Sequence, residues 1–432
     1  MSEVKPSTSE AFSFGHPGVY RVVKAGRLAS RSRLESITAV EEARDAWDRA
    51  VLRGVVPQFE IDQASPLITV ADVFCGAGGL SRGILDCCSA LGLRSSVAFG
   101  ADQDLEALSV FSSNLRPSTV VSKNVSALVD YVIEGQAESA SFAYPPYLLD
   151  PSLEPWEGRV TVLAGGPPCQ GHSSLNNRTR GEDPRNLLYL AVPALAVALK
   201  VQAVVIENVQ EVRRDRQSVF ATASSLLASE GYDVSHILMG ATQLGVPQTR
   251  RRLFLIATKG APLNLVSAYR ACGRPPRSCW YGIEDLEMQV ATDTFSSPAA
   301  VDAVSQSRID YLFDHDLFEL PNDMRPDCHK EGHSYPSVYG RLRKDLPAGT
   351  VTQGFNTIGR GRFIHPTQRR PITPQEAARL QGFPDTFSWN RADGNSWPRS
   401  TYAKLIGNAV PPQMGYAAML AILASLYPQA ES

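Results

Sequence analysis

The sequence predicts an α/β protein in which buried strands alternate with helices along an open sheet. Compact apolar runs of strand length recur, and each ends near a glycine, a proline or a polar residue. Open α/β sheets bind ligands at the carboxyl ends of their strands, so the residues after each run are the first candidates for a site. The predicted strands cover 67–74, 96–101, 160–164, 203–206, 234–240 and 253–258, and the predicted helices cover 80–91, 105–115, 183–200 and 217–229.

Length and composition limit the class of protein. The chain has 432 residues, enough for two or three domains, and 43% hydrophobic and 20% charged residues are ordinary for a globular protein. No apolar run approaches the roughly 20 residues that span a bilayer, and no signal peptide is evident, so we expect no membrane partner. Seven cysteines without a secretory signal indicate a reducing cytosol. The spacing of Cys272, Cys279 and Cys328-His329 fits paired zinc ligands poorly, so we expect no metal.

The first candidate site is a glycine turn that follows the earliest strand. The turn Cys75-Gly76-Ala77-Gly78-Gly79 separates strand 67–74 from helix 80–91, and the next strand ends at Asp102. Glycines let the backbone approach a ligand, and an acid at the next strand tip can accept from two ribose hydroxyls. The turn lacks the third glycine of the dinucleotide fingerprint. The pattern predicts a cofactor that carries an adenosine group.

The second candidate is a thiol in a stiff loop. Strand 160–164 runs into Gly-Gly-Pro-Pro-Cys-Gln-Gly-His-Ser at 165–173, where each proline restricts its own backbone and that of the preceding residue. Such a loop can hold the Cys169 thiolate, a nucleophile, at one distance from a substrate. A structural buried cysteine is the competing interpretation. Glu207, at the end of strand 203–206, could face this thiol, although it could equally be an ordinary strand-end glutamate.

A basic cluster lies between the last two predicted strands. In an extended segment, alternation places Gln248, Arg250 and Arg252 on one face. A solvated charged face competes here with contact to an anion or a base.

The flanking regions are less regular. Residues 1–65 are expected to open loosely and to contain an amphipathic helix over 34–52. Periodicity weakens over 259–345, where 10 Lys or Arg face 13 Asp or Glu, a balance that does not suit simple adhesion to phosphates. Thr373, Pro374 and Glu376 form a capping box that opens a helix, and an apolar helix that reaches about 427 is expected to pack on the core.

Six blocks in order carry a resemblance to the cytosine-5 DNA methyltransferases. The chain resembles this family over about 67–258 and 346–427. Any one block could arise by chance, whereas six in order are specific. The blocks are DVFCGAGGL at 72–80, GPPCQG at 166–171, ENV at 207–209, QTRRR at 248–252, RPIT through LQGFP at 370–384, and GNAVP at 407–411.

The resemblance implies an α/β fold with a Rossmann-like methyltransferase sheet, helices on both of its faces, and a smaller irregular target-recognition domain. DNA would lie in the cleft between the two domains. The expected division is an N-terminal extension over 1–65, a catalytic and cofactor-binding domain over 66–258 that is completed by 400–432, and a target-recognition domain and hinge over 259–399.

The resemblance also implies the reaction. A methyl group would pass from S-adenosylmethionine to carbon 5 of a cytosine that is flipped out of the duplex, because the target atom is inaccessible in the stack. Cys169 would add to carbon 6, and Glu207 would contact ring nitrogen 3 and the exocyclic amine. Arg250 and Arg252 match family positions that face the flipped cytosine and its backbone.

The remaining site residues follow from the same blocks. Asn208 would orient the Cys169 loop. This chain departs from the family pattern at two places. It has His172 where the family usually has phenylalanine, and Lys123-Asn124-Val125 where the family often has an aspartate that binds the adenine amine. Asn124 could contact that amine through its side-chain carbonyl. The cofactor would contact Phe74, Gly76, Gly78, Leu80, Asp102, Gln103, Asn124, Asn408 and Val410, and the positioning residues would be Pro168, Gln170, Ser173, Asn208 and Gln248.

The resemblance implies a bacterial or phage enzyme in the cytosol or nucleoid. We expect a monomer that modifies double-stranded DNA at one sequence and that has a cognate restriction endonuclease acting on the same site. Three alternatives stay open. The RNA-modifying branch of the fold would methylate tRNA. A catalytically dead regulatory relative should have lost the thiol or the glutamate, and both are kept. An enzyme acting on a small molecule would not explain the six blocks together.

Overall fold

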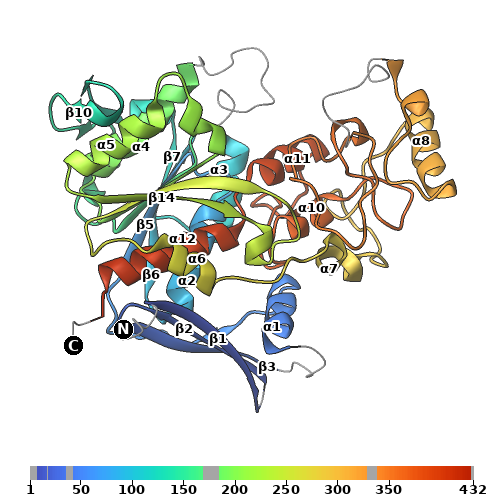
Figure 1. Cartoon of the computed structure of the whole chain (residues 1–432), viewed down its shortest axis with the longest axis horizontal. Helices are drawn as coiled ribbons and strands as arrows, with labels where there is room; N and C mark the ends of the chain where they lie inside the picture. Colours follow the sequence, from blue (N-terminus) through green and yellow to red (C-terminus); the bar gives the residue numbers. More distant parts are fainter. Residues whose placement is uncertain (1–6, 17, 36–41, 169–183, 328–337, 430–432) are drawn as a thin grey trace, which may run out of the picture.

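The computed structural model describes residues 7–16, 18–35, 42–168, 184–327 and 338–429. Its centre is a seven-stranded mixed sheet in which β15 alone runs antiparallel to the rest (Figure 1). All six strands predicted from apolar runs are confirmed, and β7 is added at one edge. In sheet order the strands are β14 (Asp233–Gly240), β15 (Arg251–Thr258), β13 (Ala203–Asn208), β12 (Val162–Gly165), β5 (Ile68–Val73), β6 (Ser95–Asp102) and β7 (Thr119–Ser122).

Helices cover both faces of this sheet, as the fold class predicted. One face packs into a single apolar core with α2, α6 and α12, and the other packs with α4 and α5. Both faces of the inner strands are buried, which explains their near-continuous apolar sequences. The helices are α2 (Gly79–Ala90), α3 (Leu105–Leu115), α4 (Leu188–Ala198), α5 (Val219–Ser229), α6 (Leu265–Ala271) and α12 (Pro412–Leu426).

The C-terminal helix is a core element. Arg399–Leu426, which comprises α11 (Arg399–Asn408) and α12, is the one described stretch long and apolar enough to cross a membrane by length and composition. Its most apolar window is 78% buried within the protein, which assigns it to the core. The expectation that no apolar run approaches membrane-spanning length was therefore too strict. Helix α11 itself was not predicted.

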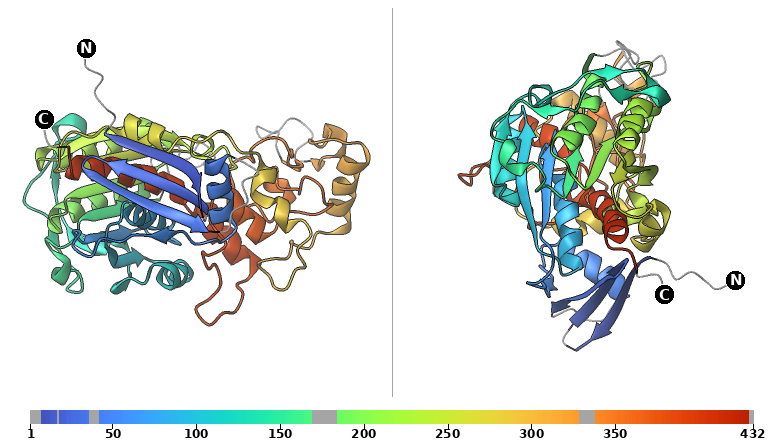
Figure 2. Two further views of the ribbon diagram at one scale, coloured as in Figure 1. Left: turned by 90° about the horizontal axis from the view of Figure 1, so that it is seen from below. Right: turned by 90° about the vertical axis from the view of Figure 1, so that its left-hand side faces the viewer.

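The N-terminal region forms a module of its own, here called the N-terminal module. Strands β1 (Thr8–Gly15), β2 (Gly18–Ala25) and β3 (Leu28–Glu35) form an antiparallel meander, which β4 (Gln58–Phe59) extends. The expectation of a loose opening was wrong. Among the described residues the predicted helix over 34–52 appears as α1 (Ala43–Leu52), and its predicted start was wrong because Leu34 belongs to β3. Figure 2 shows the meander seen from below the molecule.

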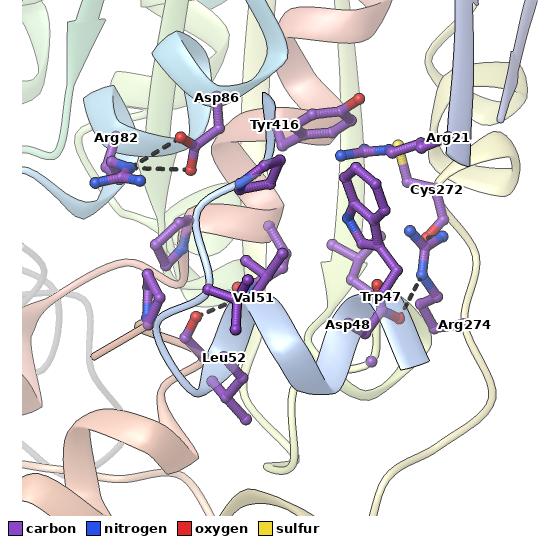
Figure 3. Close-up of a pocket in the computed structure, with 18 of the residues that line it drawn as sticks. Arg21, Trp47, Asp48, Val51, Leu52, Arg82, Asp86, Cys272, Arg274 and Tyr416 are labelled. Carbon is purple, nitrogen blue, oxygen red and sulfur yellow. Dashed lines mark hydrogen bonds and ion pairs between the residues drawn. The ribbon is translucent and has the colours of Figure 1, made fainter. Parts of the chain in front are cut away.

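Ion pairs join the N-terminal module to the rest of the chain. Glu10 on β1 lies 2.9 Å from Arg274, and Asp48 on α1 lies 2.8 Å from the same guanidinium (Figure 3). Directly after α1, Arg53 lies 2.9 Å from Glu284, which precedes the C-terminal third of the chain. The module is thus attached at several points.

The part of the chain from α7 to α10 is mostly loop. The loss of periodicity over 259–345 indicated this. Its helices enclose two smaller apolar cores. The predicted capping box is confirmed, because Glu376 N donates to Thr373 Oγ1 at 3.1 Å and Thr373 N donates to Glu376 Oε2 at 2.8 Å. The helices are α7 (Cys279–Ile283), α8 (Ala303–Asp314) and α10 (Pro374–Leu380).

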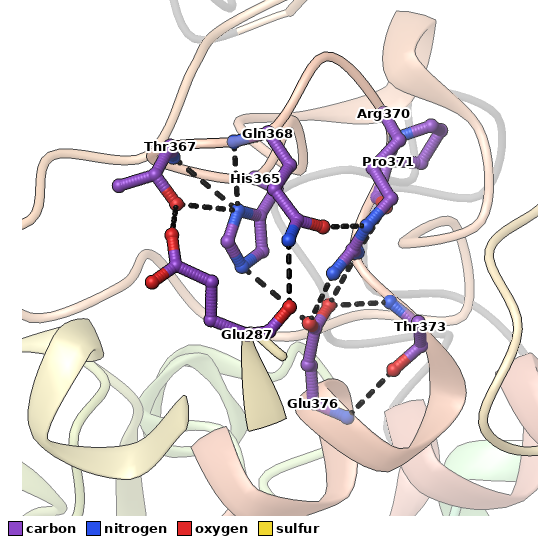
Figure 4. A network of polar contacts seen from close by, with 8 residues as sticks. All are labelled: Glu287, His365, Thr367, Gln368, Arg370, Pro371, Thr373 and Glu376. Carbon is purple, nitrogen blue, oxygen red and sulfur yellow. Dashed lines mark hydrogen bonds and ion pairs between the residues drawn. The ribbon is translucent and has the colours of Figure 1, made fainter. Parts of the chain in front are cut away.

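A buried histidine ties a loop to α10 (Figure 4). His365 Nδ1 accepts from the backbone N–H groups of Thr367 at 3.2 Å and Gln368 at 3.0 Å. The imidazole proton therefore resides on Nε2, which lies 3.4 Å from Glu376 Oε1. Burial lowers the pKa of His365 to about 4.

Residues 127–158 connect β7 to β12 through short strands and turns. Short strands pair there as two small antiparallel ladders beside α4 and α5. The strands are β8 (Val129–Asp130), β9 (Ile133–Glu134), β10 (Ser141–Phe142) and β11 (Tyr147–Leu148).

Candidate active site

A cavity of about 610 Å³, here called the central cavity, opens at the carboxyl ends of the parallel strands. Residues after β5, β6, β12 and β13 line it, together with the segment before α12. This is the position at which open α/β sheets bind ligands. The glycine turn and Glu207, at the end of β13, face this one space.

The carboxylate of Asp102 fixes the backbone of the glycine turn. Gly76 has a φ of +52°, and a Cβ atom added there would meet nothing within 4 Å. Its N–H donates to Asp102 Oδ2 at 2.9 Å, while Asp102 Oδ1 accepts from Asp104 N at 3.0 Å. Burial raises the pKa of Asp102. The turn therefore presents bare backbone to the cavity, and Asp102 borders it.

The start of α2 packs closely against the segment before α12. A Cβ atom at Gly79 would lie 2.1 Å from the carbonyl oxygen of Val410, and one at Gly78 would lie 2.6 Å from Leu115. Side chains are therefore excluded at both positions by packing. Leu80 and Val410, two predicted cofactor residues, line the cavity from either side of this contact.

Asp72, near the end of β5, also borders the cavity although the sequence did not single it out. It is 1% exposed, and Ser81 Oγ donates to its Oδ2 at 2.6 Å. Burial, reinforced by the charge of Asp102, raises the pKa of Asp72 to about 7. The next residue but one, Phe74, lines the cavity with a φ of +54°, in the left-handed region.

The two asparagines predicted to contact cofactor line the cavity but already have partners. Asn124 Oδ1 accepts from Ser126 N at 3.1 Å and Ser126 Oγ at 3.0 Å. Asn408 Oδ1 accepts from Gln353 Nε2 at 2.5 Å. The carbonyl proposed for adenine recognition is thus engaged within the protein. Gln103 lines the same wall.

Glu207 is a buried carboxylate that faces the cavity. It is 7% exposed, and Arg252 Nε lies 2.9 Å from its Oε1. This contact lacks hydrogen-bond alignment, and Glu207 forms no hydrogen bond with the described residues. The arginine therefore balances the charge while the acceptor capacity stays available to a ligand. Arg252 belongs to the site and not to a solvated face.

The end of β13 also supports the loop that leads to the thiol. Asn208 Nδ2 donates to the carbonyl oxygen of Pro167 at 3.2 Å, and Pro167 and Pro168 line the cavity. Cys169, Gln170 and Ser173, together with His172, lie outside the described residues. The described part of the loop, 166–168, borders the central cavity.

Arg250 and Gln248 connect the sheet to the C-terminal third of the chain. Arg250, 3% exposed, donates through Nη1 to the carbonyls of Val351 and Gly407, each at 3.3 Å. Gln248 is fully buried and donates to the carbonyl of Leu380 at 3.0 Å. Arg250 lines the cavity, whereas Gln248 lies behind it.

Several lining residues were missed by sequence reasoning. Gln353 and Lys404 come from the C-terminal third, Lys123 comes from the loop after β7, and Leu188 is the first residue of α4. Lys404 Nζ lies 2.7 Å from Asp104 Oδ2. No local pattern marks these residues, because tertiary packing brings them to the cavity.

The lining suits a ligand with both apolar and cationic parts. Phe74, Leu80 and Val410 supply apolar surface, and Asp72 and Asp102 supply carboxyl groups. The open face at Gly76 is the cradle that a close-fitting ligand requires. Among the described residues, no group of three or more His, Cys, Asp or Glu is arranged to hold a metal ion.

Comparisons with known proteins agree with this arrangement. The family model described as C-5 cytosine-specific DNA methylase matches residues 68–424. The chain is 36% identical over 392 residues to the Type II methyltransferase M1.BsuMI of Bacillus subtilis (strain 168), covering 90% of this chain and 87% of that protein. It is 29% identical to the Type II methylase M.HgiDII of Herpetosiphon aurantiacus, covering 80% and 92% respectively.

Solved structures share the fold at lower identity. A putative DNA modification methyltransferase encoded within a prophage (E. coli) superposes with a TM-score of 0.54 at 22% identity, covering 82% of this chain and 98% of that chain. The S. pombe Dnmt2 methyltransferase gives a TM-score of 0.55 at 14% identity, covering 83% and 98%. The predicted Rossmann-like methyltransferase fold is confirmed.

Proposed function

The chain belongs to the C-5 cytosine-specific DNA methylase family, and from this premise we propose how its residues carry out the reaction. It is a DNA (cytosine-5)-methyltransferase. The observation that carries the proposal is the sharing of one cavity by the Gly76–Asp102 turn and the Glu207–Arg252 pair. A group donor and an acceptor base can therefore meet there.

Cys169 is the proposed nucleophile. Its thiolate adds to carbon 6 of cytosine, the electron pair moves to carbon 5, and carbon 5 becomes nucleophilic. After transfer, loss of the carbon 5 proton and departure of the thiolate restore the aromatic ring. The hydrogen bond from Asn208 to Pro167 supports this role because it fixes the loop two residues before the thiol.

Glu207 is proposed to hold the ring of the cytosine. Its carboxylate has no hydrogen bond to the described residues, so it can accept from the exocyclic amine and from protonated ring nitrogen 3 as charge develops. Arg252 balances the carboxylate at 2.9 Å, and Arg250 borders the same space. The buried pair is preorganised, since little rearrangement is needed when the base arrives.

S-adenosylmethionine is the proposed cofactor, and it supplies an electrophilic methyl group. The residues proposed to hold it are Phe74, Gly76, Leu80, Asp102 and Val410, with Gln103 and Asn408 at the rim. The exposed backbone at Gly76 and the carboxyl group of Asp102 support binding of an adenosine. Gly78 is proposed to act through packing on Leu115, and Asn124 through its cap on the following turn.

The proposed substrate is duplex DNA with one recognition sequence, from which the target cytosine is flipped into the central cavity. Residues 259–399 are proposed to read that sequence, and 66–258 with 400–432 to carry out the chemistry. The relatives' designations as Type II enzymes support a role beside a restriction endonuclease with the same site. We place the protein in the cytoplasm as a monomer.

Duplexes that carry 5-fluorocytosine test this function. Fluorine at carbon 5 does not leave as a proton does, so the covalent intermediate accumulates. We expect a denaturant-resistant adduct of wild type that requires S-adenosylmethionine. Cys169→Ala should form none, whereas Cys88→Ala, which removes a thiol buried in the α2 core, should behave as wild type. Trapping on tRNA and not on DNA would contradict the proposal.

A further inference from the structure

Helix α11 ends against the central cavity, and its last carbonyl groups need hydrogen-bond donors from elsewhere. The final four carbonyls of an α-helix have no donor within the helix, and the prolines at 411 and 412 carry no N–H to supply one. The donors that reach these carbonyls therefore decide where one wall of the cavity lies. Residues 406–410, here called the cavity segment, span this helix end and line the central cavity with Gly407, Asn408, Ala409 and Val410.

Gln381, directly after α10, donates to two carbonyls of the cavity segment. Its Nε2 lies 2.6 Å from the carbonyl oxygen of Ile406 and 3.3 Å from that of Ala409. The N–H of Ala409 shares the carbonyl of Ile406, at 3.2 Å. Gln381 is fully buried, and a buried carbonyl that loses such a donor is left in an unfavourable state. The amide of Gln381 therefore fixes the position of the cavity segment.

Gln248, which precedes β15, holds Gln381 in turn. Its Nε2 donates to Gln381 Oε1 and, at 3.0 Å, to the carbonyl of Leu380. Its Oε1 accepts from Val351 N at 3.2 Å. The carbonyl of Leu380 can only accept and the N–H of Val351 can only donate, so the orientation of both amides is determined. The two side chains form a continuous link from the sheet, through the end of α10, to the cavity segment.

Two other side chains hold the cavity segment from the side of the cavity. Arg250 Nη1 donates to the carbonyl of Gly407 at 3.3 Å, and Gln353 Nε2 donates to Asn408 Oδ1 at 2.5 Å. Gly407 packs directly on the backbone of Gln353, since a Cβ atom added to it would lie 2.3 Å from Gln353 N. Arg250 and Gln353 line the cavity, whereas Gln381 does not. Gln381 therefore supports this wall from behind.

We propose that Gln381 is a positioning residue, which holds the cavity segment in the place where that segment binds S-adenosylmethionine. The inference rests on the proposed function, in which Asn408 and Val410 contact this cofactor. Gln381 acts on the cofactor only through the cavity segment, in the ground state and the transition state alike. Its loss therefore weakens cofactor binding and leaves the chemical step intact once the cofactor is bound.

Steady-state kinetics of Gln381→Met in the full chain test the proposal. Methionine is similar in size but has no N–H, so the cavity segment loses both hydrogen bonds. We expect KM for S-adenosylmethionine, and Kd for S-adenosylhomocysteine in calorimetry, to rise about tenfold, with kcat and KM for DNA within about twofold of wild type. Gln413→Met is the matched control and should leave these constants unchanged. Gln413 Nε2 donates to the carbonyl of Gly382, the residue after Gln381, at 2.8 Å.

A pH series on Gln381→Glu separates positioning from a general loss of stability. The carboxylate has no proton to donate, whereas the protonated carboxyl can donate to one of the two carbonyls. The ratio of the variant's KM for S-adenosylmethionine to that of wild type should therefore fall from about pH 8 to about pH 6. The inference is overturned if Gln381→Met matches wild type, if Gln413→Met raises KM equally, or if the Gln381→Glu ratio is independent of pH. A wild type that S-adenosylmethionine does not saturate would instead overturn the proposed function on which the inference rests.

Discussion

Asp72 gives the folded protein a predicted pH dependence that a single substitution removes. Burial raises the pKa of its carboxyl from 3.8 to about 7, while Ser81 donates to it at 2.6 Å. The folded state therefore binds this proton more tightly than the unfolded state. The resulting stabilisation is present in full below pH 3.8 and is lost as the pH rises through about 7.

The magnitude follows from the shift. Each unit of pKa difference corresponds to about 1.4 kcal/mol, so wild type should lose about 2 kcal/mol of unfolding free energy relative to Asp72→Asn between about pH 5.5 and pH 8. Asparagine retains the acceptor for Ser81 Oγ but has no proton to lose. The unfolding free energy of both proteins also changes with pH through their other titratable groups. The difference between the two proteins therefore isolates the contribution of Asp72.

Urea unfolding of both proteins at the two pH values measures this difference. Ser81→Ala is the companion variant, because it removes the hydrogen bond that lowers the pKa of Asp72 and should move the loss of stability to higher pH. A wild-type minus Asp72→Asn difference that is equal at both pH values, or that grows with pH, would refute the assignment.

Three further outcomes follow from the site and its surroundings. Glu207→Gln should lower the rate of methyl transfer by at least about 100-fold, since the ring loses its charged acceptor, while gel shift should find DNA binding intact. Asp102→Ala should weaken binding of S-adenosylhomocysteine by about tenfold or more in calorimetry, because Gly76 N–H loses a charged partner; unchanged affinity would remove Asp102 from the site. His365, whose pKa burial lowers to about 4 from 6.5, makes stability fall as the pH drops from 6.5 toward 4, by roughly 3 kcal/mol relative to His365→Asn; chemical unfolding at pH 7 and pH 4.5 checks this, and parallel curves would contradict it.

The sequence predicted the central sheet because its strands carry a strong local signal. Strands β5, β12 and β13 are buried on both faces and read as continuous apolar runs. Their functional residues stand at the ends of those runs, so Gly76, Asp102 and Glu207 were found by position and type. The structure brings these residues to one cavity.

The N-terminal meander was missed because charges interrupt its pattern. Glu10 and Arg21 lie on the strands β1 and β2 yet are largely buried as an ion pair, which obscures the alternation of apolar and polar residues. Gln353 and Lys404 were missed for another reason. Each reaches the central cavity from the C-terminal third through packing that no local pattern encodes.

The most direct test of the central claim is a map of 5-methylcytosine in DNA from cells that express the chain. Bisulfite sequencing of plasmid DNA should find one short sequence methylated at every copy with wild type. Cys169→Ala and Glu207→Gln should leave that sequence unmethylated. Methylation that persists in Cys169→Ala, or its absence from DNA with wild type, would contradict the account.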